Sequence, residues 1–151
     1  MNGSEIIETD HEKSLPLHDL KGECLAYARE QFQGKKFINR ATGREIIVSK
    51  DGLGEWKSKS KSREQVLSVK ILDKLLENAI FDHDMDDKLG RKNIEKILYF
   101  HSLCVIGNNK YNAVITIRMI KNYGEKYYHH YLEDSKIEPR SGLTRPAGET
   151  G

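Results

Sequence analysis

The chain has 151 residues, of which 37% are hydrophobic and 32% are charged, and its formal net charge is +2. This length and composition predict one globular domain, and the small net charge does not by itself point to nucleic acid. No apolar run is long enough for a transmembrane helix, and the polar N-terminus lacks the apolar segment of a signal peptide.

Both ends of the chain hold few residues that a core would bury. We expect residues 1–14 to be a disordered tail and residues 139–151 to be a flexible tail or a linker stub. Residues 15–138 then form a single α+β domain. Apolar residues recur at helical spacing from Pro16 to Gln33 and predict an N-terminal helix at its start.

The segment that follows the first helix predicts a short β-hairpin and then a long helix. Two short runs, residues 36–39 and 44–49, flank Ala-Thr-Gly and predict the hairpin. A wide apolar stripe over residues 63–81 predicts a long amphipathic helix. The Asp-rich stretch 82–93 predicts an exposed loop. Its sixth position is Asp87 where a calcium-binding loop has glycine, so we expect no metal, and no other cofactor.

Three lysines alternate with serines just before the long helix. In an extended segment Lys57, Lys59 and Lys61 point the same way and Trp56 points to the opposite side. The lysines are candidates for contacts with RNA phosphates, Trp56 for stacking on a base, and Arg63 for a further contact from the first turn of the helix. The alternative is a solvated lead-in, with Trp56 packed on the helix.

The chain from Ile97 to Leu132 predicts three antiparallel β-strands joined by two tight turns. Apolar and polar residues alternate with the period of a strand. With Asn108–Asn109 at the centre of the first turn, His101 lies opposite Thr116, and Arg118 lies two residues along the same strand. These three side chains therefore share one face of the sheet.

The second turn leaves two registers open. With Tyr123–Gly124 at its centre, His129 joins the cluster and Tyr131 lies opposite the threonine. With a three-residue loop at 122–124 the register slips by one residue, and His130 joins instead. In either case we expect one histidine within about 7–8 Å of the first, as a cross-strand diagonal neighbour.

This cluster contains the side chains needed for RNA cleavage. Two imidazoles supply a general base and a general acid, and a guanidinium stabilises charge on a phosphate attacked by the adjacent 2′-hydroxyl. The alternative is a solvent-facing sheet surface without chemistry. The candidate catalytic residues are His101, Arg118, His129, His130, Tyr131 and Thr116.

The two cysteines, Cys24 and Cys104, both fall within apolar patterns. We expect buried free thiols, which are typical of a reducing compartment. The sequence thus favours a cytoplasmic protein, with delivery into a host cell as an alternative.

Several stretches together resemble a known family. In order they are AREQFQGKKFINRATGREIIVS, GLGEWKSKS, an amphipathic helix and a strand ending in YYHHYL. From Ala28 to Leu132 the chain is similar to the third of the domains associated with large polyvalent proteins of phages and conjugative elements. The resemblance implies an α+β fold of the barnase, EndoU, colicin-ribonuclease and RelE type, with helices followed by a twisted antiparallel sheet.

The resemblance also implies a function. Members of that superfamily are mostly metal-independent ribonucleases, often toxins, and others are binding modules. It supports Glu55 and the run Lys57–Lys61 as the polar entry to the second helix, and the YYHHYL strand as the source of a catalytic histidine.

We therefore expect a metal-independent, toxin-like or effector-like endoribonuclease domain of a mobile genetic element, which uses histidine acid–base catalysis. The main alternative is a catalytically inactive module that binds nucleic acid or protein, and the third is a structural module of a phage particle. The expected partners are RNA or another nucleic acid and a protein such as an antitoxin or immunity protein, with no membrane.

Overall fold

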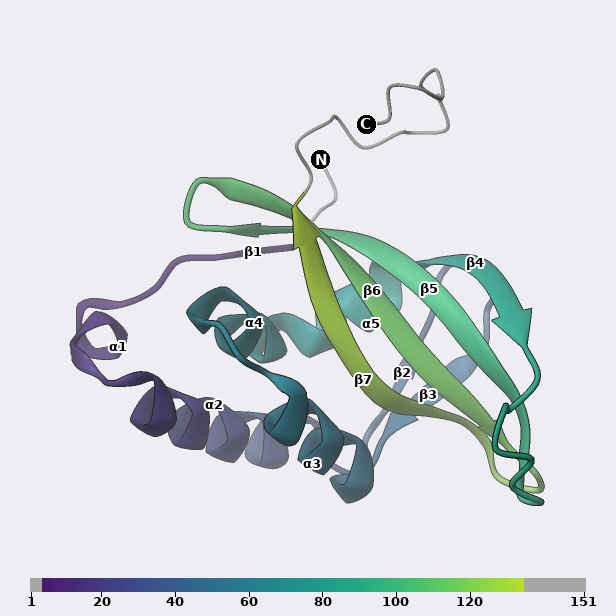
Figure 1. Ribbon diagram of the computed structural model, residues 1–151. Helices are drawn as coiled ribbons and strands as arrows, with labels where there is room; N and C mark the ends of the chain where they lie inside the picture. Colours follow the sequence, from purple (N-terminus) through teal and green to yellow (C-terminus); the bar gives the residue numbers. More distant parts are fainter. Residues whose placement is uncertain (1–3, 135–151) are drawn as a thin grey trace.

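The computed structural model describes residues 4–134, which form helices packed on a curled β-sheet (Figure 1). The α+β class is confirmed. The elements in chain order are β1 Ser4–Ile6, α1 Asp10–Ser14, α2 Leu17–Phe32, β2 Lys36–Ile38, β3 Glu45–Val48, α3 Lys50–Lys59, α4 Arg63–Ser68, a 3-10 turn Val69–Ile71, α5 Leu72–Asn78, β4 Ile80–Met85, β5 Ile94–Ile106, β6 Asn109–Ile120 and β7 Gly124–Asp134.

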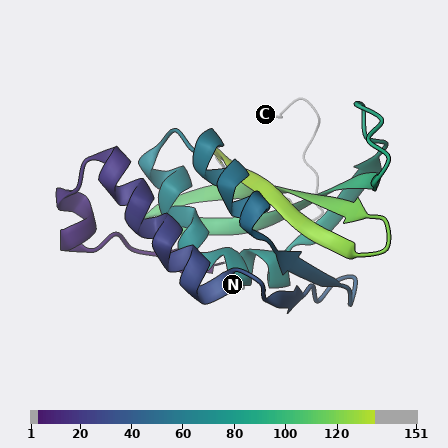
Figure 2. The same ribbon diagram turned by 90° about the horizontal axis from the view of Figure 1, so that it is seen from below.

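The sheet has seven strands in the order β1-β5-β6-β7-β3-β2, and β4 also pairs with β5. The β1–β5 and β3–β7 pairs are parallel, and the other pairs are antiparallel. The predicted three-strand meander is therefore the centre of a larger mixed sheet that curls into a half-barrel. The predicted β2–β3 hairpin is confirmed. Figure 2 shows the helices gathered on one side of the strands.

The core lies between the helices and one face of β5, β6 and β7. Phe100, Ile115 and Tyr127 contribute large side chains from the three strands, each at most 1% exposed. Trp56 and Leu72 are fully buried on the helical side. Alternate residues of each strand face this core, which is why the period-2 pattern of the sequence is so regular. Burying this apolar surface supplies the main favourable term in folding.

The predicted long helix over residues 63–81 is broken into α4, the 3-10 turn and α5. Ser68 lies at the break. Its hydroxyl donates a hydrogen bond to the Gln65 carbonyl, with 2.6 Å between the oxygens. Such a local side-chain bond competes with the helical ladder and favours a tighter turn. The chain then leaves the helical conformation at Ala79.

The lysine segment is helical, and this corrects the extended row that we expected. Ser49 begins α3 by accepting a hydrogen bond from the Gly52 backbone at 3.2 Å. In the sequence, Gly52 and Gly54 predict a break after the preceding strand and no helix. In the structure both lie inside α3. Lys57 and Lys59 therefore lie on a helix and do not form a straight row.

Two further segments differ from expectation. Residues 82–85 of the expected loop belong to β4, which pairs with β5 along its length. Of the expected N-terminal tail, the part from Ser4 on forms β1 and α1, with Ser4 opposite Cys104. The expected tail at 139–151 lies outside the described residues.

The register of the β5–β6 hairpin differs by two positions from our prediction. Ile106 pairs with Asn109, so the central residues of the turn are Gly107 and Asn108. Gly107 takes a φ of +63°, which glycine adopts at no steric cost. A shift of two preserves which residues share a face, so the predicted faces of both strands remain correct although Tyr99, not His101, lies opposite Thr116.

Among the described residues, no helix is long and apolar enough to cross a membrane. Cys24 and Cys104 are buried free thiols, as predicted, and burial raises the pKa of each to about 12.

Two glycines of α3 provide a matched pair of variants. A Cβ added at Gly52 would overlap the Tyr127 carbonyl oxygen, whereas a Cβ added at Gly54 would meet no described atom within 4 Å. We expect Gly52→Ala to lower the free energy of unfolding by ~1–3 kcal/mol or more, because α3 must move away from β7. Gly54→Ala is expected to raise it by ~0.5–1 kcal/mol through helix propensity. Urea unfolding measures both, and equal effects would refute the close approach.

Candidate functional site

The candidate residues lie on the outer face, meaning the face of β4, β5, β6 and β7 directed away from the helices. Tyr99, Thr116 and His129 are paired directly across three strands. His101 lies in the next row, opposite Val114. The pairing register thus confirms that His101, Thr116 and a histidine of β7 share one face, and it selects His129.

His101 and His129 are not neighbours, however. They lie on β5 and β7, with β6 between them, and one row apart. Two strand spacings of about 4.8 Å and one two-residue step put their Cα atoms roughly 12 Å apart. The expected diagonal contact at about 7–8 Å is therefore not met. His101 is exposed.

A β-bulge in β7 decides which side chains meet. Thr116 pairs with His129 but Ile117 pairs with Tyr127, so Tyr128 is the extra residue. A bulge redirects the side chains beside it. Tyr128 consequently lies against Arg118, whose guanidinium carbon is 3.5 Å from the ring centroid. The His129 ring stacks on Tyr128 at 5.3 Å with an interplanar angle of 28°.

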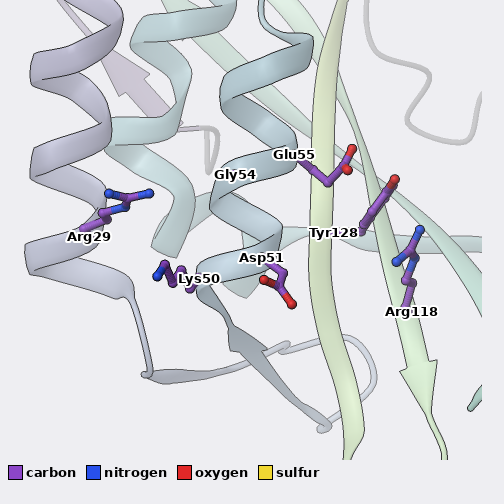
Figure 3. A pocket seen from close by; sticks show the side chains of 7 residues that line it. All are labelled: Arg29, Lys50, Asp51, Gly54, Glu55, Arg118 and Tyr128. Atoms are coloured by element: carbon purple, nitrogen blue, oxygen red, sulfur yellow. The ribbon is translucent and has the colours of Figure 1, made fainter.

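Helix α3, which packs beside β7, contributes two charged side chains to the same region. Lys59 Nζ lies 5.2 Å from the Tyr128 ring centroid and 3.5 Å from a Glu55 carboxylate oxygen. Figure 3 shows Tyr128 between Glu55 and Arg118. We call the five residues Glu55, Lys59, Arg118, Tyr128 and His129 the β7 site.

The β7 site borders an open hollow of about 360 Å³. Three cationic side chains and two carboxylates line it, together with Gly54 and the tyrosine ring. The cations outnumber the carboxylates, so the hollow favours an anionic ligand. The lining residues are Arg29, Lys50, Asp51, Gly54, Glu55, Arg118 and Tyr128.

Within residues 4–134, two polar atoms of the β7 site are buried and find no hydrogen-bond partner, namely Arg118 Nε and His129 Nδ1. Most buried polar groups in proteins are paired, so such atoms call for an explanation. Burial, with the nearby positive charges of Lys59 and Arg118, lowers the pKa of His129 to about 4. His129 is therefore neutral at pH 7 and can accept a proton.

Sequence reasoning did not include Glu55 and Tyr128 among the site residues. The resemblance pointed to Glu55 only as part of a polar entry to a helix. Tyr128 reaches the site through the bulge, and a single extra residue in a strand leaves no periodic signal. Of the predicted catalytic residues, Arg118 and His129 lie in the site, and Thr116 lies beside it.

His130 points the other way, into the core, and is 1% exposed. Its Nε2 lies 2.7 Å from the Ser68 hydroxyl and its Nδ1 lies 2.7 Å from the Tyr127 hydroxyl. Because Ser68 donates its proton to the Gln65 carbonyl, His130 Nε2 donates to Ser68 and Tyr127 donates to Nδ1. This chain of hydrogen bonds fixes one tautomer and is structural. Tyr131, by contrast, is 45% exposed on the outer face, paired with Val114.

The residues predicted to contact nucleic acid do not form one continuous surface. Trp56 is fully buried in the core, so its ring is not available to a base; the alternative placed it against the helix that follows. Arg63 binds Glu8 at 2.6 Å and the carbonyl oxygens of Leu15 and Glu12, so it joins the N-terminal segment to α4. Of the lysines, Lys59 lies in the β7 site.

The buried histidine makes stability depend on pH. Burial, and secondarily His129, lowers the pKa of His130 from 6.5 to about 3. Between pH 3 and 6.5 the unfolded chain binds a proton at this residue that the folded chain does not, so the free energy of unfolding rises with pH by up to ~1.4 kcal/mol per unit. Urea unfolding at pH 4, 5, 6 and 7 should show a flatter pH dependence for His130→Gln.

Tyr127→Phe is the control for this experiment. It removes a hydrogen bond to the ring and is expected to lower stability at every pH, but it keeps the buried imidazole and therefore the slope. An unchanged slope in His130→Gln would show that other groups carry the acid sensitivity.

Comparison with known proteins gives one match. Residues 16–128 match the family model described as large polyvalent protein-associated domain 3, which spans more than half of the chain. No curated protein and no solved structure matches.

Proposed function

The chain belongs to the large polyvalent protein-associated domain 3 family, and we propose that this domain is a metal-independent endoribonuclease whose active centre is the β7 site. The observation that carries the proposal is that Arg118 Nε and His129 Nδ1 are buried with no partner among the described residues, in a site that borders a hollow with excess positive charge. In its cellular setting we propose a toxin-like or effector-like enzyme of a mobile element.

The proposed reaction uses one histidine in two roles. Neutral His129 takes the proton from the 2′-hydroxyl, whose oxygen attacks the adjacent phosphorus while Arg118 and Lys59 stabilise the added negative charge. The bond from phosphorus to the 5′-oxygen then breaks. Because the pKa of His129 in the folded protein is low, its protonated form readily gives the proton to the departing oxygen. The products are a 2′,3′-cyclic phosphate and a 5′-hydroxyl.

Tyr128 and Glu55 are positioning residues in this scheme. The tyrosine ring lies against the guanidinium of Arg118 and beneath the ammonium of Lys59, and so holds both cations through their attraction to its face. Glu55 pairs with Lys59 one helical turn away and limits its freedom. The arrangement is preorganised before the substrate arrives.

A second function is favoured by one observation, the separation of His101 from His129 by a full strand. If cleavage needs two cooperating histidines, this geometry instead suits a catalytically inactive module that binds nucleic acid through the same cations. Activity assays on matched histidine variants separate the two.

We expect the protein to cut RNA in the presence of EDTA and to leave 2′,3′-cyclic phosphate ends. His129→Gln should lower kcat by ~10²–10⁴-fold, the contribution of one acid–base group. His101→Gln is the matched control and should retain most activity, because His101 lies outside the β7 site. Equal losses in both variants would favour a two-histidine mechanism, and RNA bound but left intact would favour the binding module.

Lys59 and Lys57, which lie two residues apart on α3, provide a second matched pair. Both side chains are exposed, but Lys59 lies over the Tyr128 ring, whereas Lys57 lies two residues earlier and faces a different side of the helix. Lys59→Gln should weaken RNA binding and reduce the salt dependence of log K by ~1 unit of slope, because one phosphate contact is lost. Lys57→Gln should change neither. Fluorescence anisotropy at several salt concentrations measures both quantities, and identical behaviour of the two variants would exclude a specific role for Lys59.

A further inference from the structure

The row that contains His129 continues across the outer face beyond the β7 site. In register, His83 of β4 pairs with Tyr99 of β5, Tyr99 with Thr116 of β6, and Thr116 with His129 of β7. Because directly paired residues share a face, these side chains form one row across four strands. The row leads straight from the proposed base of the reaction to the edge of the sheet.

Aromatic rings stand open along this face. The rings of His83 and Tyr99 are stacked, with centroids 4.8 Å apart and planes within 20° of parallel. The His83 side chain is 52% exposed, and Tyr131, in the next row, is 45% exposed. The latter ring meets His129 edge-on at 6.4 Å. The face thus offers flat π surfaces beside the β7 site, with ring planes already fixed by stacking.

We propose that this face binds the unpaired bases of single-stranded RNA next to the cleaved phosphate, an inference that rests on the proposed function. Every base has a π-face that stacks on an aromatic ring whatever its identity, and four-stranded sheets with exposed rings hold two or three bases in this way. In a duplex these faces are buried in the helical stack, so a row of rings selects RNA that is unpaired.

The charges on the face orient the strand. Arg118 and Lys59 stand at the β7 end and attract phosphate, whereas Asp82 stands at the β4 end, 2.7 Å from His83 Nδ1. A carboxylate there disfavours phosphate and leaves the rings to the bases. The backbone of the RNA therefore lies toward β7, and its bases lie across β5 toward β4.

The test uses fluorescein-labelled 2′-O-methyl RNA of mixed sequence, which lacks the attacking hydroxyl and cannot be cleaved. Binding of the single strand is compared with binding of the same strand annealed to its complement. We expect the single strand to bind at least about tenfold more tightly. Tyr99→Leu and His83→Leu should each weaken single-strand binding by about 5- to 30-fold and leave duplex binding unchanged, since each removes one stacking ring.

Tyr27→Leu is the matched control, because Tyr27 is a 39% exposed tyrosine on α2, on the helical side of the sheet. It should leave binding unchanged, and thermal melts confirm that each variant folds. Equal binding of single strand and duplex, or unaltered binding by both ring variants, would overturn the inference. No binding of either RNA would also overturn it and leave the face to a protein partner. Cleavage of unmodified RNA, assayed separately, tests the proposed function. Binding that depends on the rings but is not followed by cleavage would refute the proposed nuclease activity and support this inference.

Discussion

The structure depends on how β7 satisfies its backbone where its parallel neighbour ends. Strand β3 pairs with β7 only from Glu125 to Tyr127. Beyond that point the Gln65 side chain takes over, because its amide nitrogen donates to the His130 carbonyl and its amide oxygen accepts from the Leu132 backbone at 2.9 Å. A single side chain thus repeats the donor and acceptor pattern of a strand, and without it two backbone groups beside the core would lose their partners.

This change of partner coincides with the bulge, which decides which of two adjacent histidines faces outward. His129 turns outward to the β7 site, and His130 turns inward to Ser68 and Tyr127. The inner histidine fixes the strand on α4, while α3 approaches the same strand closely at Gly52. Both helices therefore support the strand beside the bulge, directly behind the outer histidine. Rigid support of this kind is what a catalytic or binding group requires.

The faces of the strands were predictable because a strand has a strict period of two. That is why His101, Thr116 and Arg118 could be assigned to one face even though the turn is centred on Gly107 and the exact pairs differ. The choice between His129 and His130 was not predictable, since one extra residue reverses the alternation without any change in composition.

Helix α3 shows a different limit of sequence reasoning. Glycine has a low intrinsic helix propensity, so from the sequence Gly52 and Gly54 predict a loop and no helix. In the structure Gly52 is required for another reason, since any larger residue would collide with the Tyr127 carbonyl. This is a tertiary contact, which local propensity does not contain. Because the sequence did not predict α3, it also did not predict that Glu55 and Lys59 lie one helical turn apart beside β7.

The two ends of the outer face therefore differ in what surrounds them. At the β7 end a helix adds charged groups beside the sheet, and burial keeps His129 neutral there. At the β4 end the strand pairs with β5, and its residues are exposed. A neutral base among cations suits proton transfer next to a phosphate, whereas open rings suit flat, uncharged bases. Under the proposed function, one sheet face can thus separate the chemical step from the recognition of the substrate, because helix α3 adds charged groups beside only one of its ends.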